Sequence, residues 1–429
     1  MKRRQNLFTF FCYILICTFL SNFQGLSYGQ ENDEKDVPRE QQPVQDRKVG
    51  DSLVENLAEL PGKLITAPFY FTIELLKLLH VQKIYLRTTD LLTSEDGTRT
   101  LRPIFSPGGG GGATFRQRNL LHPGMTFRAH ASFANKTRRL VYGDLRDPGL
   151  FTKKWGLHLR GFNWRKPTER FYGIGNDAKE EDRTDYLDDE TSFEGTILFS
   201  PSKETSFGLG FAYSDVAIED GRDNGQPNLD SLFTPLEVPG FFGEKMWTVT
   251  LKFYSDSRNE AGHPRRGAEQ YVAMQLSKDR DLGYFKFIVD LRRYFNLFYR
   301  RVLAVRVRTE ITDDLGNREV PFYRLPGLGG EDLLKGYQSY RFQDDDLAYV
   351  SAEYRVPLSP MVNLTLFVEE GRVFQNMLDD FTFSDWHYSY GGGLRFRASN
   401  GGLITSFIIA KSDEDTRILF GLNTEIRGF

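Results

Sequence analysis

The fold of this chain is decided by the stretch LPGLGGEDLLKGYQSYRFQDDDLAYVSAEYRVPL, Leu325 to Leu358. Its first part predicts a long loop with four glycines, Gly327, Gly329, Gly330 and Gly336. Because glycine adopts positive φ angles and allows close backbone approach, such a loop can fold back on itself and enter a confined space. The last part, Tyr349 to Pro357, predicts a strand. On these residues alone, a flexible surface loop is the alternative.

A basic side chain stands at the apex of this loop, and an acidic one stands in a strand further along the chain. The apex sequence is Leu334, Lys335, Gly336 and Tyr337. The strand is NLTLFVEEGRVF, residues 363–374. Since successive side chains of a strand point to opposite faces, Phe367, Glu369 and Gly371 share one face.

These two motifs resemble those of the bacterial surface antigen family, the outer-membrane barrel domain of BamA, TamA and the two-partner secretion transporters. In that family an apolar-Arg-Gly-aromatic motif on the sixth extracellular loop folds into the barrel lumen. Its Arg pairs with the Asp of a Phe-x-Asp-x-Gly motif in the wall. Here Lys335 replaces the Arg and Glu369 replaces the Asp, which keeps the charges but loses the planar bidentate contact of a guanidinium.

The resemblance implies that Lys335 and Glu369 meet in the lumen. Gly336 would allow the close approach, and Tyr337 or Phe367 would pack beside the pair. Two independent solvated charges in the lumen are the alternative.

Apolar and polar residues alternate in many segments after the glycine-rich run Ser106–Ala113, which itself predicts a mobile turn or a glycine-rich first strand. Clear examples are Ser206–Val216, Met246–Ser255, Tyr284–Arg292 and Val302–Glu310. A soluble β-sandwich would show the same alternation. The aromatic residues on the apolar faces instead favour the interfacial girdles of a transmembrane barrel.

Charged or Gly/Asn/Asp-rich segments separate the predicted strands. The longer ones are residues 179–190, 219–230, 256–266 and the loop at the centre of the motif, and the shorter ones are residues 200–204 and 277–281. We interpret this difference as long loops on one side of a barrel and tight turns on the other.

The predicted fold is all-β, a transmembrane antiparallel β-barrel preceded by a short helical segment. The barrel is predicted over residues 104–429, which can hold about 16 strands at roughly 20 residues per strand and connection. The resemblance implies the same number.

Three segments precede the predicted barrel. Residues 1–29 are predicted to be a signal peptide, with a basic region, an apolar core and small residues before Gln30. Both cysteines of the chain, Cys12 and Cys17, lie within it, so the mature chain would have no thiol. Residues 30–52 are charged and predict a disordered linker.

Residues 53–103 predict a short helical segment, because leucines recur there at helical spacing and Pro61 and Pro68 divide it. This segment would lie on the membrane surface or pack on the rim of the barrel. Family members usually carry periplasmic POTRA repeats ahead of the barrel. We expect these repeats to be absent, since the segment shows no alternating strand pattern.

The composition gives no reason to expect an enzyme, a cofactor or a nucleic-acid partner. The net charge is −3, and the six histidines show no paired spacing of metal ligands. The resemblance implies a bacterial outer-membrane barrel that inserts or exports proteins or handles lipid. Its partners would be outer-membrane lipid and an unidentified protein client or periplasmic partner. A passive channel, or a structural barrel without a client, is the alternative.

Overall fold

The computed structural model describes residues 92–106, 110–223, 225–260, 262–316, 319–359, 362–397 and 404–423. The predicted signal peptide and linker, and the predicted helical segment up to residue 91, lie outside the described residues. Among the described residues, no helix combines the length and the apolar character that are needed to cross a membrane.

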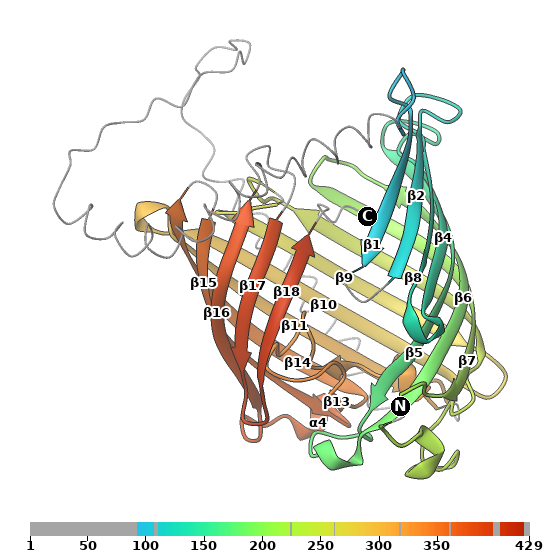
Figure 1. Cartoon of the computed structure of the whole chain (residues 1–429), viewed down its shortest axis with the longest axis vertical. Coiled ribbons are helices and arrows are strands. Elements are labelled where there is room, and N and C mark those ends of the chain that lie inside the picture. Colours follow the sequence, from blue (N-terminus) through green and yellow to red (C-terminus); the bar gives the residue numbers. More distant parts are fainter. Residues whose placement is uncertain are drawn as a thin grey trace. The chain divides into compact units, whose positions relative to one another are not determined.

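From Arg99 onward the chain forms a single 16-stranded antiparallel sheet (Figure 1). Strands of this sheet that follow one another in the sequence are neighbours in the sheet. The strands are β1 (Arg99–Ser106), β2 (Gly110–Arg118), β3 (Thr126–Phe133), β4 (Arg139–Asp147), β5 (Trp155–Phe171), β6 (Thr184–Phe199), β7 (Thr205–Asp220), β8 (Lys245–Asp256), β9 (Gly267–Lys278), β10 (Gly283–Asn296), β11 (Val302–Asp314), β14 (Asp346–Ser359), β15 (Val362–Phe374), β16 (His387–Arg397), β17 (Ile404–Lys411) and β18 (Thr416–Asn423). The predicted all-β class and strand number are confirmed.

The connection between β11 and β14 contains a separate two-stranded ladder, β12 (Gly327–Leu328) with β13 (Phe342–Gln343). The helix α4 (Met377–Asp380) lies between β15 and β16. Figure 1 shows the sheet curling round, with β1 and β18 in front of the fainter strands β8 to β10. Among the described residues no ladder joins β1 to β18, so both are edge strands.

Apolar side chains are exposed on the outer face of the sheet and charged side chains are buried on its inner face, which is the reverse of a soluble protein. On the outer face Phe193 and Trp247 are 62% and 63% exposed, whereas the charged side chains of Lys286 and Glu310 on the inner face are both 8% exposed. A β-sandwich would bury the apolar set instead. The arrangement is that of a barrel wall with lipid outside and a polar lumen inside.

Two predicted boundaries differ from the structure. The sheet begins at Arg99 rather than at residue 104, because residues 99–103 pair with residues 113–117 of the glycine-rich strand β2. The second half of the predicted loop 179–190 belongs to β6, where Glu190 pairs with Trp164 and Val216 of the neighbouring strands. Its carboxylates suggested a loop, but a strand that lines a polar lumen accepts them.

The predicted separation of long and short connections was partly wrong. In an antiparallel sheet with sequential neighbours, connections alternate between the two ends. The long β7–β8 and β11–β14 connections therefore share one end. However, the connection at residues 257–266 lies at the other end, and the short turn at residues 279–282 lies with the long ones. The position of a connection in the strand order, rather than its length, decides at which end of the sheet it lies.

An apolar cluster lies toward the end of the sheet that carries the long connections. It gathers Phe171, Tyr186, Val216, Ile218, Leu229, Val238, Met246, Leu282, Tyr284, Val320, Phe322 and Leu325. We call it the apolar cap. Phe322 lies at its centre, 0% exposed, with edge-on contacts to the rings of Phe171 and Tyr186 at 4.9 and 5.1 Å.

Phe322→Ala is expected to reduce the free energy of unfolding by about 3–5 kcal/mol, because a buried ring is removed and the cap cannot fill the space. Urea unfolding of the refolded barrel in micelles measures this loss. Phe383→Ala is the matched control, since that ring is 87% exposed. Equal effects of the two substitutions would contradict the cap as a packed core.

Candidate functional site: the lumen loop and its seat on the wall

The connection between β11 and β14, residues 315–345, folds inside the sheet and is called the lumen loop here. Its contacts reach inward-facing residues on several strands, which places it against the inner wall. Arg324 pairs with Glu190 of β6 at 2.9 Å, and Asp332 pairs with Arg306 of β11 at 3.1 Å. The loop therefore spans the lumen between separate parts of the wall.

The apex of the loop turns back through its own backbone. The amide of Gly329 donates to Leu333 O at 3.0 Å, and that of Gly330 donates to Tyr337 O at 3.1 Å. Both glycines have φ angles above 100°, a region that side chains other than glycine rarely adopt. The fold-back packs Leu334 and Tyr337 against Leu347 and Val373 of the wall, all buried. The glycines thus make the docked shape possible.

Lys335 and Glu369 are in contact. The ammonium of Lys335 forms an ion pair with Glu369 Oε1, and its backbone amide donates to Oε2 at 2.7 Å. The hydroxyl of Tyr349 also donates to Oε1, at 3.0 Å. Glu369 is 1% exposed, so its charge depends on these three donors. The Lys335 ammonium also lies 5.0 Å from the centre of the Phe367 ring, a cation–π contact.

Gly336 sits where no side chain fits. Its amide donates to Ser389 Oγ on β16 at 2.8 Å, and its carbonyl accepts a bond from Ser412 Oγ at 3.1 Å. A Cβ atom at this position would lie 2.8 Å from the backbone of Lys411 and Ser412. The absence of a side chain lets the loop reach the connection between β17 and β18.

Tyr337 continues this contact toward the last two strands. Its hydroxyl donates to Asp413, and its carbonyl accepts a bond from Arg417 of β18. Burial and the neighbouring Asp413 raise the pKa of the Tyr337 hydroxyl, so it remains protonated as the donor. The remaining predicted residue, Gly371, faces Leu328 of the loop, whose methyl groups would lie 3.0 Å from an added Cβ.

Three further anchors of the loop were not predicted from the sequence: Arg324 with Glu190, Asp332 with Arg306, and Arg341 with Glu414. Arg341 pairs with Glu414 at 2.8 Å and donates to Ala178 O at 2.7 Å. The partners lie 134, 26 and 73 residues apart in the sequence, and no pattern in one sequence identifies such pairs.

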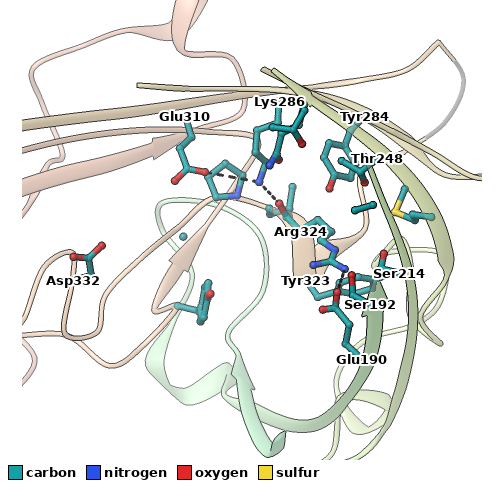
Figure 2. Close-up of a pocket in the computed structure, with 18 of the residues that line it drawn as sticks. Glu190, Ser192, Ser214, Thr248, Tyr284, Lys286, Glu310, Tyr323, Arg324 and Asp332 are labelled. Carbon is teal, nitrogen blue, oxygen red and sulfur yellow. Dashed lines mark hydrogen bonds and ion pairs between the residues drawn. The ribbon is translucent and has the colours of Figure 1, made fainter. Parts of the chain in front are cut away.

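A polar cavity of about 720 Å³ lies between the loop and the wall formed by β6 to β11. Figure 2 shows Glu190, Lys286, Glu310, Tyr323 and Arg324 around it. Lys286 donates to Arg324 O at 2.5 Å and lies 3.8 Å from a Glu310 oxygen. The loop therefore narrows the lumen and leaves a polar chamber beside it.

No cluster of histidine, cysteine, aspartate or glutamate in the described part of the chain has the arrangement of a metal site. The acidic and basic side chains of the site instead pair with each other. Its chemistry is that of a docking contact between a loop and a wall.

Residues 119–426 match the family model of the Omp85 superfamily domain. Among solved structures, the chain is similar to BamA from Haemophilus ducreyi lacking POTRA domains 1–3, with a TM-score of 0.54, 18% identity and coverage of 76% of this chain and 69% of that one. This likeness concerns the fold.

Two further structures are CdiB from Acinetobacter baumannii and CdiB from Escherichia coli. Their TM-scores are 0.46 and 0.49, at 13% and 10% identity, and they cover 73% and 74% of this chain. The chain spans 56% and 58% of their lengths.

A double-mutant cycle on Lys335→Met and Glu369→Gln is expected to give a coupling of about 1.5–3 kcal/mol in unfolding free energy, as for a hydrogen bond between charged groups. The matched control is the exposed outer pair Lys245 and Asp215, 3.2 Å apart, for which about 1 kcal/mol or less is expected. Coupling in the lumen pair no larger than in the control would show that the two charges act independently.

Proposed function

The chain belongs to the Omp85 superfamily, and from this premise we propose that it inserts or exports client polypeptides across the seam between β1 and β18. Omp85 proteins lie in the outer membrane and act in protein assembly or secretion rather than as enzymes. The resemblance seen in the sequence is therefore confirmed at the level of the family. The client role is our proposal for this chain.

The seam supports the proposal because no ladder within the described residues closes it. Residues 92–94 pair with the start of β1, where the amide of Leu101 donates to Leu92 O at 2.9 Å. Each edge strand presents backbone N–H and C=O groups on one side that no neighbour within the described residues pairs in a ladder. Such an edge is a template onto which another strand can add. A client strand would pair with β1 or β18 and leave the barrel sideways into the membrane.

The observation that carries the proposal is where the lumen loop is anchored. Its apex bonds to Glu369 on β15, to Ser389 on β16 and to Asp413 in the β17–β18 connection, and Arg417 of β18 bonds back to it. These elements are the last four strands before the seam. The loop thus braces one side of the seam while leaving its edge free, which is what a wall that opens locally requires.

A passive channel is the second candidate, and the polar chamber beside the loop favours it. The chamber is lined by charged and hydroxyl side chains such as Glu190, Thr248 and Lys286. If the loop were displaced, this lining would suit water and ions.

Single-channel recordings in planar bilayers separate the two candidates. We expect low, flickering conductance for the wild type and a higher conductance for Lys335→Met, because the substitution removes the ion pair with Glu369 and so weakens the docking of the loop. Lys245→Met, on the outer face, is the control and should not change the conductance. A large and steady conductance that is indifferent to Lys335 would favour the passive channel.

The same proteins are then reconstituted in vesicles and given an unfolded outer-membrane barrel as client. The proposal predicts that the wild type accelerates folding of the client and that Lys335→Met does so less. No acceleration over empty vesicles would contradict the client role.

A further inference from the structure

The turn between β10 and β11 carries an unusual concentration of arginine and aromatic residues on the outside of the wall. The sequence from Arg292 to Arg301 is RRYFNLFYRR. Arg292 faces the lumen, where it bonds to Asp290 at 3.3 Å, so alternation places Arg293 and Phe295 on the outer face. Phe298 and Tyr299, in the turn itself, are 64% and 76% exposed.

Two of these arginines stack on the aromatic rings. The guanidinium of Arg293 lies 5.8 Å from the centre of the Phe295 ring, and that of Arg301 lies 5.3 Å from the centre of the Phe298 ring. Arg301 also donates to the hydroxyl of Tyr354 at 3.3 Å. These contacts hold the guanidinium groups at the edge of the outer wall, and among the described residues no hydrogen-bond acceptor other than Tyr354 is found for them.

The arginines of this turn differ from those in the lumen in having no acidic partner. In the lumen, Arg306 and Arg308 both pair with Asp290, at 2.7 and 3.0 Å. Within the described part of the chain, no carboxylate pairs with Arg293, Arg300 or Arg301. Three positive charges at one edge therefore lack a counter-charge from the described residues.

The backbone of the turn is also unfavourable for the residues it holds. Tyr299 and Arg300 have φ angles of 52° and 59°, and the amide of Arg301 donates to Phe298 O at 3.2 Å. This is the pattern of a type I′ turn, whose central positions favour Asn-Gly. Two large side chains occupy these positions against the preference of the backbone, as Lys136 and Thr137 do in the β3–β4 turn, but here the side chains are an aromatic ring and a guanidinium.

The turn lies at the end of the sheet opposite the lumen loop. Connections at the loop end are rich in carboxylates, as in residues 379–385 and 413–415, whereas the turn end carries basic pairs at residues 153–154, 265–266 and 300–301. This inference takes its orientation from the proposed function, in which the lumen loop is an extracellular connection. The turn then lies at the periplasmic leaflet of the outer membrane.

We propose that the β10–β11 turn binds the phosphate headgroup of an anionic phospholipid in the periplasmic leaflet. Guanidinium groups bind phosphate oxygens through paired N–H donors. Exposed phenyl and phenol rings beside them suit the boundary between headgroups and acyl chains. An acidic protein is a poorer match, because Arg293 and Phe295 face outward and are continuous with the lipid-facing residue Val307, which is 46% exposed.

Native mass spectrometry of the refolded barrel tests this proposal. The protein in micelles is offered phosphatidylglycerol and phosphatidylcholine, and the ratio of the two bound lipids is measured. We expect the triple variant Arg293→Gln, Arg300→Gln and Arg301→Gln to lose the preference for phosphatidylglycerol by roughly a hundredfold, given the usual contribution of each basic residue at an anionic surface.

The matched control is Lys153→Gln, Lys154→Gln and Lys203→Gln, which removes the same charge at the same end of the sheet, beside the exposed rings of Phe151 and Trp155 but on connections other than the β10–β11 turn. It should keep most of the preference. Equal loss in both triple variants would overturn the proposed site in favour of a general effect of charge. An unchanged ratio in the arginine variant would also overturn it, as would binding of an acidic peptide to this turn without a lipid preference.

A second variant guards against misfolding. Tyr299→Asn with Arg300→Gly suits the type I′ turn, so it should fold at least as well as the wild type and yet bind less phosphatidylglycerol. Its control is Lys136→Asn with Thr137→Gly, in the β3–β4 turn, where φ is 59° and 68°. That change should leave lipid binding unaltered. The measurement uses no client, so it can fail or succeed independently of the insertion and conductance tests.

Discussion

A buried carboxylate is the constraint on which the arrangement of this barrel depends. Glu369 is almost completely removed from solvent, and a charge in that position is tolerated only when donors surround it. Two of its donors, the ammonium and the backbone amide of Lys335, come from the lumen loop. The loop must therefore be docked for the carboxylate of Glu369 to have its hydrogen-bond donors. The wall in turn fixes the shape of the loop.

The docked loop connects parts of the wall that are distant in the sheet. Arg324 ties it to β6, and Arg306 ties it to β11. Phe322, two residues before the first of these anchors, forms the centre of the apolar cap. One segment therefore links the lumen contacts, the cap and the strands next to the seam. A barrel whose first and last strands are not joined by a ladder needs such an internal brace to keep its shape, and the brace leaves the edges themselves available.

Much of the fold could be predicted from the sequence, because a wall between lipid and a polar lumen imposes alternation on every strand. The pairing of Lys335 with Glu369 could be anticipated from a family resemblance together with that period of two. The beginning of β6 could not, since residues such as Asp188 and Glu190 look like loop residues until the lumen is known to be polar. The end of the sheet at which a connection lies could not be predicted either, because it requires every preceding strand to be identified correctly. The ion pairs of Arg324 and Arg341 join residues that only the closed tertiary structure brings together.

Hydrogen exchange of the backbone amides of Lys335 and Gly336 tests the central claim most directly. These amides donate to Glu369 and to Ser389 of the wall, at 2.7 and 2.8 Å. If the loop is docked as described, both amides exchange slowly in the wild type, and the protection is lost in Glu369→Ala while the strand amides remain protected. Exchange in the wild type as fast as at the exposed turn residues Ser202 and Lys203 would contradict the account.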